Sequence, residues 1–382
     1  MTPQDTLRFE WRDSFDEFLA LEQHWRALED RIPDRMVFGT FDHMVSWYRS
    51  HREAYGPPLI GVAWRATEVV GILPLVFRKA TLGRVPVRRF DGAGMDGETG
   101  EILFPRSESE ALTGLLDSLV QRGGFDVFDL FGVAPGSWRD QAIVSCAERH
   151  RLSMRRIPYR YATIDLSRGF EAYQQGLSAK LRGNLRRREK RAKEMGEIGF
   201  DRIHRPVDRA TLHAHLNRVF GIAVRSWKAV DGDAMKEHYR RFYRDLCERF
   251  NDRGLLDLSI MTVGGRDASF IVGLRERETF YDVTVSYDEG FAGISPGTLL
   301  IQEVAKRIAA EGIRLLVSHG DREYKRYWAS EWIPQVRTIV FGRGLRASAS
   351  RLARFTIPEW VERLRGTRPR PVDKTTPPSV PA

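Results

Sequence analysis

The sequence of 382 residues has only two cysteines and no long apolar run. Cys146 and Cys247 are too few for a disulfide framework or a cysteine-based zinc site, which indicates a reducing compartment. Residues 1–12 lack the apolar segment of a secretion signal, and no stretch of about 18 apolar residues suggests a membrane span. These absences predict a cytoplasmic protein.

Histidines and carboxylates do not recur at the spacing of a metal site. His213 and His215 lie two residues apart on a predicted helix and therefore on different faces. His319 is isolated in the sequence. We expect no metal ion.

Large apolar side chains are abundant: 42% of the residues are hydrophobic and 11% are aromatic. A disordered chain carries far fewer, so the sequence predicts a substantial core. At about 150 residues per domain the length predicts two or three domains, and we expect two.

The predicted elements recur in the same order in the two halves of the chain. Each half has helices, then a strand hairpin, a loop, a helix, a strand and a helix. The fold class is therefore α/β (mixed α+β), with a duplicated fold. We expect domains at 1–166 and 167–345, a helical extension at 346–366, and a disordered, proline-rich tail at 367–382.

Positive charge is concentrated in two segments. The net charge is +10, yet residues 178–193 hold eight Lys and Arg against Glu189 alone, and residues 343–370 hold eight Arg against two Glu. Arg182, Arg186 and Lys190 recur every four residues along one face of a predicted helix. Such a face favours cofactor phosphates, RNA or an anionic membrane surface, and the alternative is a solvated helix face.

Two short motifs fit known patterns but lack their chemistry. Residues 92–97 fit G-x-G-x-x-G, but no helix follows to receive a pyrophosphate. Residues 293–297 fit the G-x-S-x-G motif of hydrolases, but Pro296 has no N–H for an oxyanion hole and no His follows Asp321. Ser295 instead predicts a helix N-cap, after which the N–H groups of Gly297, Thr298 and Leu299 are free to bind phosphate. A plain capped helix is the alternative.

Several patches together resemble the GNAT acyltransferase superfamily, in its Fem-type branch and closest to CelD-like acetyltransferase domains of polysaccharide-related proteins. The patches extend to about Phe341. They are Phe41-Asp42 with Trp47, the sequence GILPL at 71–75, LRGNLRRR at 181–188, Ser226-Trp227-Lys228, Tyr287-Asp288, Ser295-Pro296-Gly297, and Gly320-Asp321 with Tyr324-Lys325.

The resemblance implies two tandem GNAT-like domains, each a twisted mixed sheet flanked by helices, with the active site in the second. It implies an N-acyltransferase that moves an acyl group from acyl-CoA, in particular acetyl-CoA, to an amino group of a small molecule or a cell-envelope or polysaccharide precursor. Residues 290–293 depart from the superfamily's usual pyrophosphate loop. Alternatives are an aminoacyl-tRNA-dependent Fem-type transferase and a non-catalytic protein that binds nucleic acid or another polyanion through residues 178–193.

The resemblance also assigns roles to individual residues. Tyr287 or Tyr324 is the expected acid for the leaving thiolate. Asp288 is a candidate base, which requires a raised pKa, or else a turn cap. The expected donor-binding residues are Ser295, Gly297, Thr298, Arg182 and Arg186, and the expected acceptor-binding residues are Trp227, Lys228, Asp321 and Lys325.

The expected partners follow from this chemistry. They are acyl-CoA and an acceptor that bears an amine, and tRNA is the one nucleic acid we expect as an alternative donor. Peripheral membrane contact through residues 345–364 is a further alternative to a packed C-terminal helix. The sequence does not indicate an oligomeric state.

Overall fold

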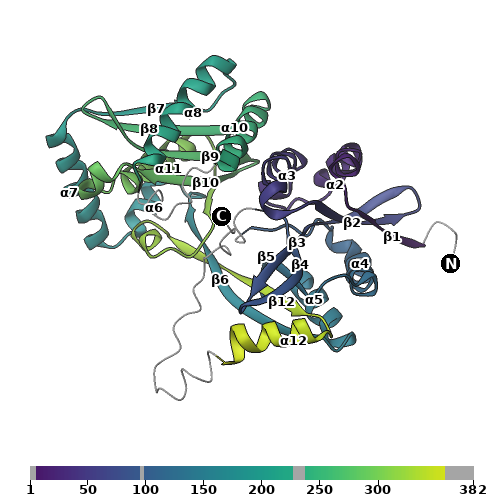
Figure 1. The fold of residues 1–382 in the computed structure, drawn as a ribbon. Coiled ribbons are helices and arrows are strands. Elements are labelled where there is room, and N and C mark those ends of the chain that lie inside the picture. Colours follow the sequence, from purple (N-terminus) through teal and green to yellow (C-terminus); the bar gives the residue numbers. More distant parts are fainter. Residues whose placement is uncertain (1–5, 95–98, 227–236, 358–382) are drawn as a thin grey trace. The chain divides into compact units, whose positions relative to one another are not determined.

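The computed structural model describes residues 6–94, 99–226 and 237–357 (Figure 1). The chain divides into two compact units: unit 1 comprises residues 1–159 and 334–382, and unit 2 comprises residues 160–333. The sequence predicted a boundary at 166/167 and a second domain that extends to 345. The first boundary instead falls inside a strand, and the chain returns to unit 1 at residue 334.

Unit 1 is a mixed sheet with helices. Its strand order is β1-β2-β3-β4-β5-β12, and every neighbouring pair is antiparallel except β4 and β5, which are parallel. The strands are β1 (Leu7–Arg12), β2 (Pro58–Arg65), β3 (Glu68–Leu82), β4 (Val85–Gly92), β5 (Val127–Val133) and β12 (Glu331–Phe341), which enters the unit at residue 334. The helices are α1 (Phe15–Leu19), α2 (Glu22–Asp30), α3 (Phe41–Tyr55), α4 (Ser109–Arg122), α5 (Trp138–Arg149) and α12 (Leu345–Arg351).

Unit 2 repeats this arrangement. Its strand order is β7-β8-β9-β10-β11-β6, again antiparallel except for one parallel pair, β10 and β11. The strands are β6 (Ser153–Asp165), which enters at residue 160, β7 (Ile198–Ile203), β8 (Leu256–Val263), β9 (Arg266–Glu276), β10 (Thr279–Tyr287) and β11 (Leu315–Ser318). The helices are α6 (Phe170–Gly176), α7 (Ala179–Met195), α8 (Arg209–Val224), α10 (Glu237–Asp252) and α11 (Pro296–Ala310), with 3₁₀-helices η4 (Glu289–Ile294) and η5 (Glu323–Tyr327).

The repeat confirms the predicted mixed α/β class and the duplicated fold. In each unit four antiparallel strands lead through one helix, α4 or α11, into a parallel neighbour. The strand on the other side of this parallel neighbour comes from elsewhere in the chain. In unit 1 it is β12, which pairs with β5 and follows unit 2 in the sequence. In unit 2 it is β6, which pairs with β11 and precedes the other elements of that unit. The described residues also contain no helix with the length and apolar character needed to span a bilayer.

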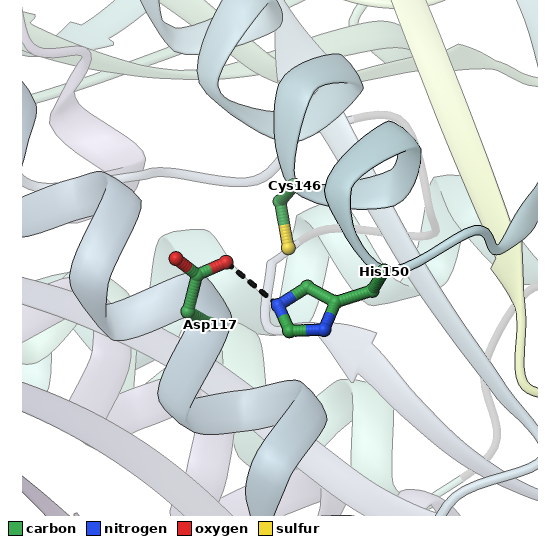
Figure 2. A group of neighbouring side chains, drawn as sticks. All are labelled: Asp117, Cys146 and His150. Atoms are coloured by element: carbon green, nitrogen blue, oxygen red, sulfur yellow. Dashed lines mark hydrogen bonds and ion pairs between the residues drawn. The ribbon is translucent and has the colours of Figure 1, made fainter.

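Helices α4 and α5 pack together in the core of unit 1. Leu112, Leu116 and Leu119 of α4 are fully buried and share one core cluster with Ile143 and Ala147 of α5, because residues three and four apart lie on one helix face. Where the two helices face each other, Asp117 meets side chains of the last turn of α5 and the residue after it (Figure 2). The packing therefore fixes the position of this polar group.

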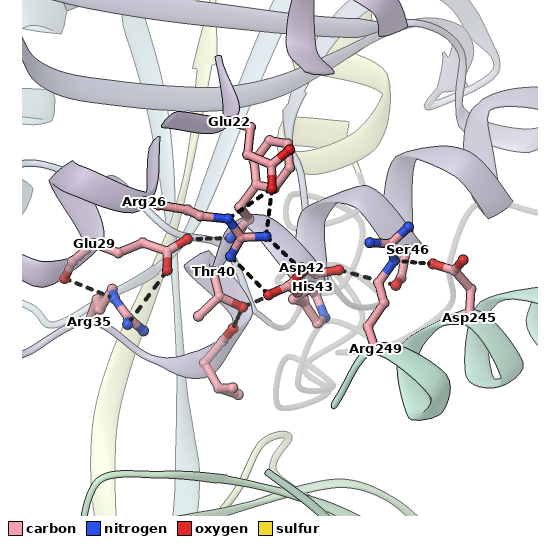
Figure 3. Close-up of polar contacts among 12 residues, drawn as sticks. Glu22, Arg26, Glu29, Arg35, Thr40, Asp42, His43, Ser46, Asp245 and Arg249 are labelled. Carbon is pink, nitrogen blue, oxygen red and sulfur yellow. Dashed lines mark hydrogen bonds and ion pairs between the residues drawn. The ribbon is translucent and has the colours of Figure 1, made fainter. Parts of the chain in front are cut away.

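The segment between α2 and α3 is held by charges that are largely buried (Figure 3). Both terminal nitrogens of Arg26 bind the Asp42 carboxylate at 3.0 Å. Arg35 lies 3.8 Å from the Glu29 carboxylate and donates to the Glu29 carbonyl at 3.1 Å. Thr40 caps α3 through its hydroxyl. Removal of one partner would leave the other charge desolvated, so this segment is held rigidly.

Glu101, whose carboxylate accepts the Met36 N–H at 3.2 Å, provides a pH-dependent term in the stability of unit 1. Burial raises the pKa of Glu101 from 4.5 to about 7, although Arg139 opposes the shift. Between these two values the folded chain holds the proton more tightly than the unfolded chain does. The free energy of unfolding therefore falls as pH rises through this window, by at most about 3 kcal/mol.

Glu101→Gln is expected to remove this fall, because glutamine retains the acceptor and does not ionise. Denaturant unfolding between about pH 5 and pH 8 measures the slope. Glu110→Gln, at an exposed position of α4, is the matched control and should leave the slope unchanged. Parallel curves for the parent and Glu101→Gln would contradict the prediction.

Candidate active site

The pairing between the two parallel strands of unit 2 stops before β10 ends. They pair only from Thr279 and Leu315 to Asp282 and Ser318. Strand β11 ends at Ser318, whereas β10 continues to Tyr287. Ligands of open sheets with parallel strands bind at such carboxyl ends.

Strand β10 also has a bulge where its pairing with β11 stops. Its register with β9 shifts between Asp282 and Thr284, so Val283 has no partner residue in β9. A bulge removes one residue from the regular ladder and bends the strand. Val283 is the residue that the bulge sets apart.

Tyr287 lies at the end of β10, beside the start of α11. A Cβ atom added to Gly297 would lie 3.8 Å from the Tyr287 ring. Burial raises the pKa of the Tyr287 hydroxyl, and the negative charge of Glu289 and a hydrogen bond with it add to the shift. The structure thus brings together two residues that the sequence singled out separately.

The first turn of α11 differs from the predicted N-cap. Ser295 adopts a left-handed conformation with φ 50° and ψ 59°, and its side chain makes no capping hydrogen bond. Its carbonyl instead accepts the N–H groups of Thr298 at 2.9 Å and Leu299 at 3.3 Å. Two of the three N–H groups expected to be free are therefore engaged. The Gly297 N–H has no acceptor among the described residues.

The conformation of Ser295 is itself informative. A left-handed non-glycine residue costs roughly 1–3 kcal/mol, and such strain concentrates at functional sites. Pro296 follows with no N–H, so the Gly297 N–H is the first that the helix presents. Of the three N–H groups predicted to bind phosphate, only that of Gly297, beside Tyr287, is therefore available.

Asp288 is not poised to act as a base. Its carboxylate accepts a hydrogen bond from Arg225 at 2.5 Å and another from the Gly290 N–H at 2.9 Å. Burial by itself would raise the pKa of Asp288, but these hydrogen bonds, Arg225 first, hold it below its usual value. This direction is opposite to the one a base requires, so Asp288 orders the turn between β10 and α11.

Three predicted residues follow the carboxyl end of β11. Asp321 lies 3.2 Å from Arg160, whose guanidinium stacks 4.0 Å over Trp332. Lys325 is 3% exposed and donates to the His319 carbonyl, so it orders this loop. Tyr324 is 39% exposed. Because β10 and β11 are parallel, these residues and Tyr287 follow strand ends at the same edge of the sheet.

The predicted cationic ladder on α7 is only partly available. Arg182 donates to the carbonyls of Gln175 and Leu177 and so closes the end of α6. Lys190 lies 3.9 Å from Glu194. Arg186 is exposed and, like the exposed Lys180 and Arg191, has no partner among the described residues. Trp227 and Lys228 lie outside the described residues.

In unit 1 the carboxyl end of the β4–β5 pairing, which corresponds to that of β10 and β11, holds charged side chains that are paired with one another. The last parallel pair of β4 and β5 is Asp91 with Asp129, which matches Asp282 with Ser318 in unit 2. Asp129 is fully buried and binds Arg89 at 2.6 Å and Arg337 at 2.5 Å. Arg89 also binds Asp91 at 2.8 Å. Strand β4 pairs with β3 without a register shift, so unit 1 lacks the bulge of β10.

Comparisons with known proteins agree with this geometry. Residues 179–326 match the family model described as acetyltransferase (GNAT) domain, a span that includes β10, α11 and β11. No curated protein sequence matches the chain.

Solved structures show the same fold over most of the chain. A crystal structure of FemX has a TM-score of 0.55 at 11% identity and covers 86% of this chain and 96% of that one. A conserved protein of unknown function from Bacteroides thetaiotaomicron VPI-5482 has a TM-score of 0.54 at 16% identity, and the match covers 87% of this chain and 100% of that one. The C-terminal domain of a putative lysylphosphatidylglycerol synthetase from Agrobacterium fabrum has a TM-score of 0.52 at 10% identity, and the match covers 88% of this chain and 96% of that one.

Proposed function

We propose that this chain is an N-acyltransferase, since residues 179–326 match the GNAT acetyltransferase model and the fold is shared with FemX. It moves an acyl group from acyl-CoA, most simply acetyl-CoA, to an amino group of a small molecule or a cell-envelope or polysaccharide precursor. The observation that carries the proposal is that β10 continues past the end of its pairing with β11, with a bulge at Val283 and with Tyr287 beside Gly297.

The reaction assigns a task to each of these three residues. The amine attacks the thioester carbonyl, a C–N bond forms, and the C–S bond then breaks. The Val283 N–H donates to the oxygen that becomes negative, because a preformed backbone donor stabilises this charge. The Gly297 N–H, at the positive end of α11, holds a phosphate of the donor.

Tyr287 supplies the proton that the leaving thiolate takes. Burial and the neighbouring Glu289 raise the pKa of its hydroxyl, so the group remains protonated at neutral pH. Tyr324 is the alternative acid, since it follows the carboxyl end of the neighbouring strand. The amine proton leaves to solvent or to the acceptor's own groups.

Gly297→Val is expected to raise the KM for acetyl-CoA about tenfold or more, with a smaller change in kcat. A branched side chain beside the helix start obstructs the approach of a phosphate. The fold should tolerate the change, because the nearest atoms to an added Cβ, on Tyr287 and Val285, are 3.8 Å away.

Steady-state kinetics with varied acetyl-CoA tests this prediction, and a thermal melt confirms folding. Gly293→Ala is the matched control, because an added Cβ there has no atom within 4 Å and the residue precedes the helix. An unchanged KM in a folded Gly297→Val enzyme would show that the donor phosphates do not approach this turn.

An aminoacyl-tRNA donor is the second candidate, favoured by the exposed cations Lys180, Arg186 and Arg191 on α7. A polyanion that contacts several cations binds with a steep salt dependence. Thermal shifts with a panel of CoA esters and with charged tRNA separate the two donors, since a ligand of the native state raises Tm. A shift with tRNA alone would replace acyl-CoA as the proposed donor.

A further inference from the structure

Unit 1 brings together three side chains of the kinds that bind transition metals. Cys146 and His150 are four residues apart at the end of α5 and so lie on one face. Asp117 approaches from α4 (Figure 2). One potential ligand atom from each residue lies within 4.8 Å of the other two, and Asp117 Oδ1 is 2.9 Å from His150 Nε2.

The two helices hold these side chains in place, and two of the three are partly exposed to solvent. Cys146 is fully buried and belongs to the same core cluster as the apolar residues of α4 and α5. The side chains of Asp117 and His150 are 27% and 23% exposed. An ion can therefore enter from solvent, and a water molecule can complete its coordination.

The donor set suits zinc better than calcium or magnesium. Zinc binds thiolate sulfur at about 2.3 Å, imidazole nitrogen at about 2.0–2.1 Å and carboxylate oxygen at about 2.0–2.2 Å. Tetrahedral geometry then places the ligand atoms about 3.3–3.8 Å apart. The sulfur must approach the other two ligand atoms by no more than about 1.5 Å. Asp117 Oδ1 and His150 Nε2, which are 2.9 Å apart, must instead move apart by about 0.4 Å. Side-chain rotation supplies both movements. Calcium and magnesium prefer oxygen ligands alone.

We propose that unit 1 binds one zinc ion through Cys146 Sγ, His150 Nε2 and the Asp117 carboxylate, with water as the fourth ligand. Arg149, which now binds Asp117 Oδ1 at 2.8 Å, stays as an outer partner of the carboxylate. Binding displaces the Cys146 thiol proton into solvent. The ion ties α5 to α4, and its ligands belong to unit 1, whereas the proposed acyl-transfer residues belong to unit 2.

The spacing of histidines and carboxylates along the chain predicts no metal site. The signal it lacks is Cys146 followed four residues later by His150, a pair that only a helix brings together. The third ligand lies on another helix, so no sequence spacing reveals it.

Cobalt binding to the full chain, stripped with a chelator beforehand, tests the proposal. Co²⁺ in a tetrahedral site with a thiolate gives visible ligand-field bands and a near-ultraviolet charge-transfer band from sulfur. We expect one equivalent to bind, Zn²⁺ to displace it and Mg²⁺ to have no effect.

Variants test whether Cys146 supplies the sulfur that binds the metal ion. Cys146→Ser should abolish the charge-transfer band, and His150→Gln should weaken cobalt binding at least about tenfold. Cys247→Ser is the matched control, because Cys247 is equally buried but lies in unit 2, and it should retain both signals. Absence of the band in the parent protein, or its loss in Cys247→Ser alone, would overturn the proposal. His150→Gln keeps the test decisive if Cys146→Ser does not fold.

Discussion

Tyr287→Phe is expected to lower kcat about 10²-fold or more, with little change in the KM for the donor. Phenylalanine keeps the ring, which lies beside Gly297, and removes the proton that the thiolate needs. The hydroxyl contributes only when the C–S bond breaks, so its loss affects the transition state and not donor binding. Initial-rate kinetics with acetyl-CoA and an identified amine acceptor measure the effect.

Tyr324→Phe is the matched comparison. If Tyr287 is the acid, this second variant retains nearly full kcat, since its side chain is 39% exposed and gains little from a desolvated environment. The reverse result would transfer the role to Tyr324. Full activity in both variants would exclude both hydroxyls and leave a bound water or direct departure of the thiolate.

The largest expected effect on stability comes from Asp129→Asn, at about 3–5 kcal/mol of unfolding free energy. Asp129 is fully buried and faces two guanidinium groups, those of Arg89 and Arg337. A neutral amide has nearly the same shape, yet it leaves these positive charges without half of their compensation. Denaturant unfolding of the full chain measures the loss.

An exposed ion pair provides the control for this variant. Asp13 and Arg122 lie 3.4 Å apart, and their side chains are 66% and 39% exposed. Asp13→Asn should cost less than about 1 kcal/mol, because water screens such pairs. A loss below about 1 kcal/mol in Asp129→Asn would mean that water solvates Arg89, whose side chain is 4% exposed, in the folded unit.

Elements with local signals were predicted well from the sequence. Helix α7 was expected at 178–195 and occurs at Ala179–Met195, and the Ser178 hydroxyl accepts the Leu181 N–H. Its cap, its charged surface and the glycine that ends it all lie within one continuous segment, from Ser178 to Gly196. The repeated order of helices and strands was also visible, because the apolar patterns of both halves are strong.

Features that depend on distant residues were not predicted. The apolar run at 159–166 predicts only the second part of β6, which begins at Ser153. Arg155, Arg156 and Pro158 interrupt the apolar alternation before this run. Arg182 appeared to be a free cation until the fold placed it against the carbonyls that end α6. The left-handed conformation of Ser295 and the bulge at Val283 depend on how β10 and α11 meet. No single residue type in the sequence predicts either feature.

Strand β6 comes before the other strands of unit 2, and β12, which completes unit 1, comes after them. During synthesis the sheet of unit 2 can therefore be completed before that of unit 1. Unit 2 has every strand once residue 318 has been made, because β6 precedes the rest of that unit. Unit 1 must wait for residues 334–341, which pair with β5, although most of its chain leaves the ribosome first. Until then β5 has an unpaired edge, and such edges promote aggregation. A nascent or truncated chain that stops before β12 therefore contains a complete second unit and an incomplete first one.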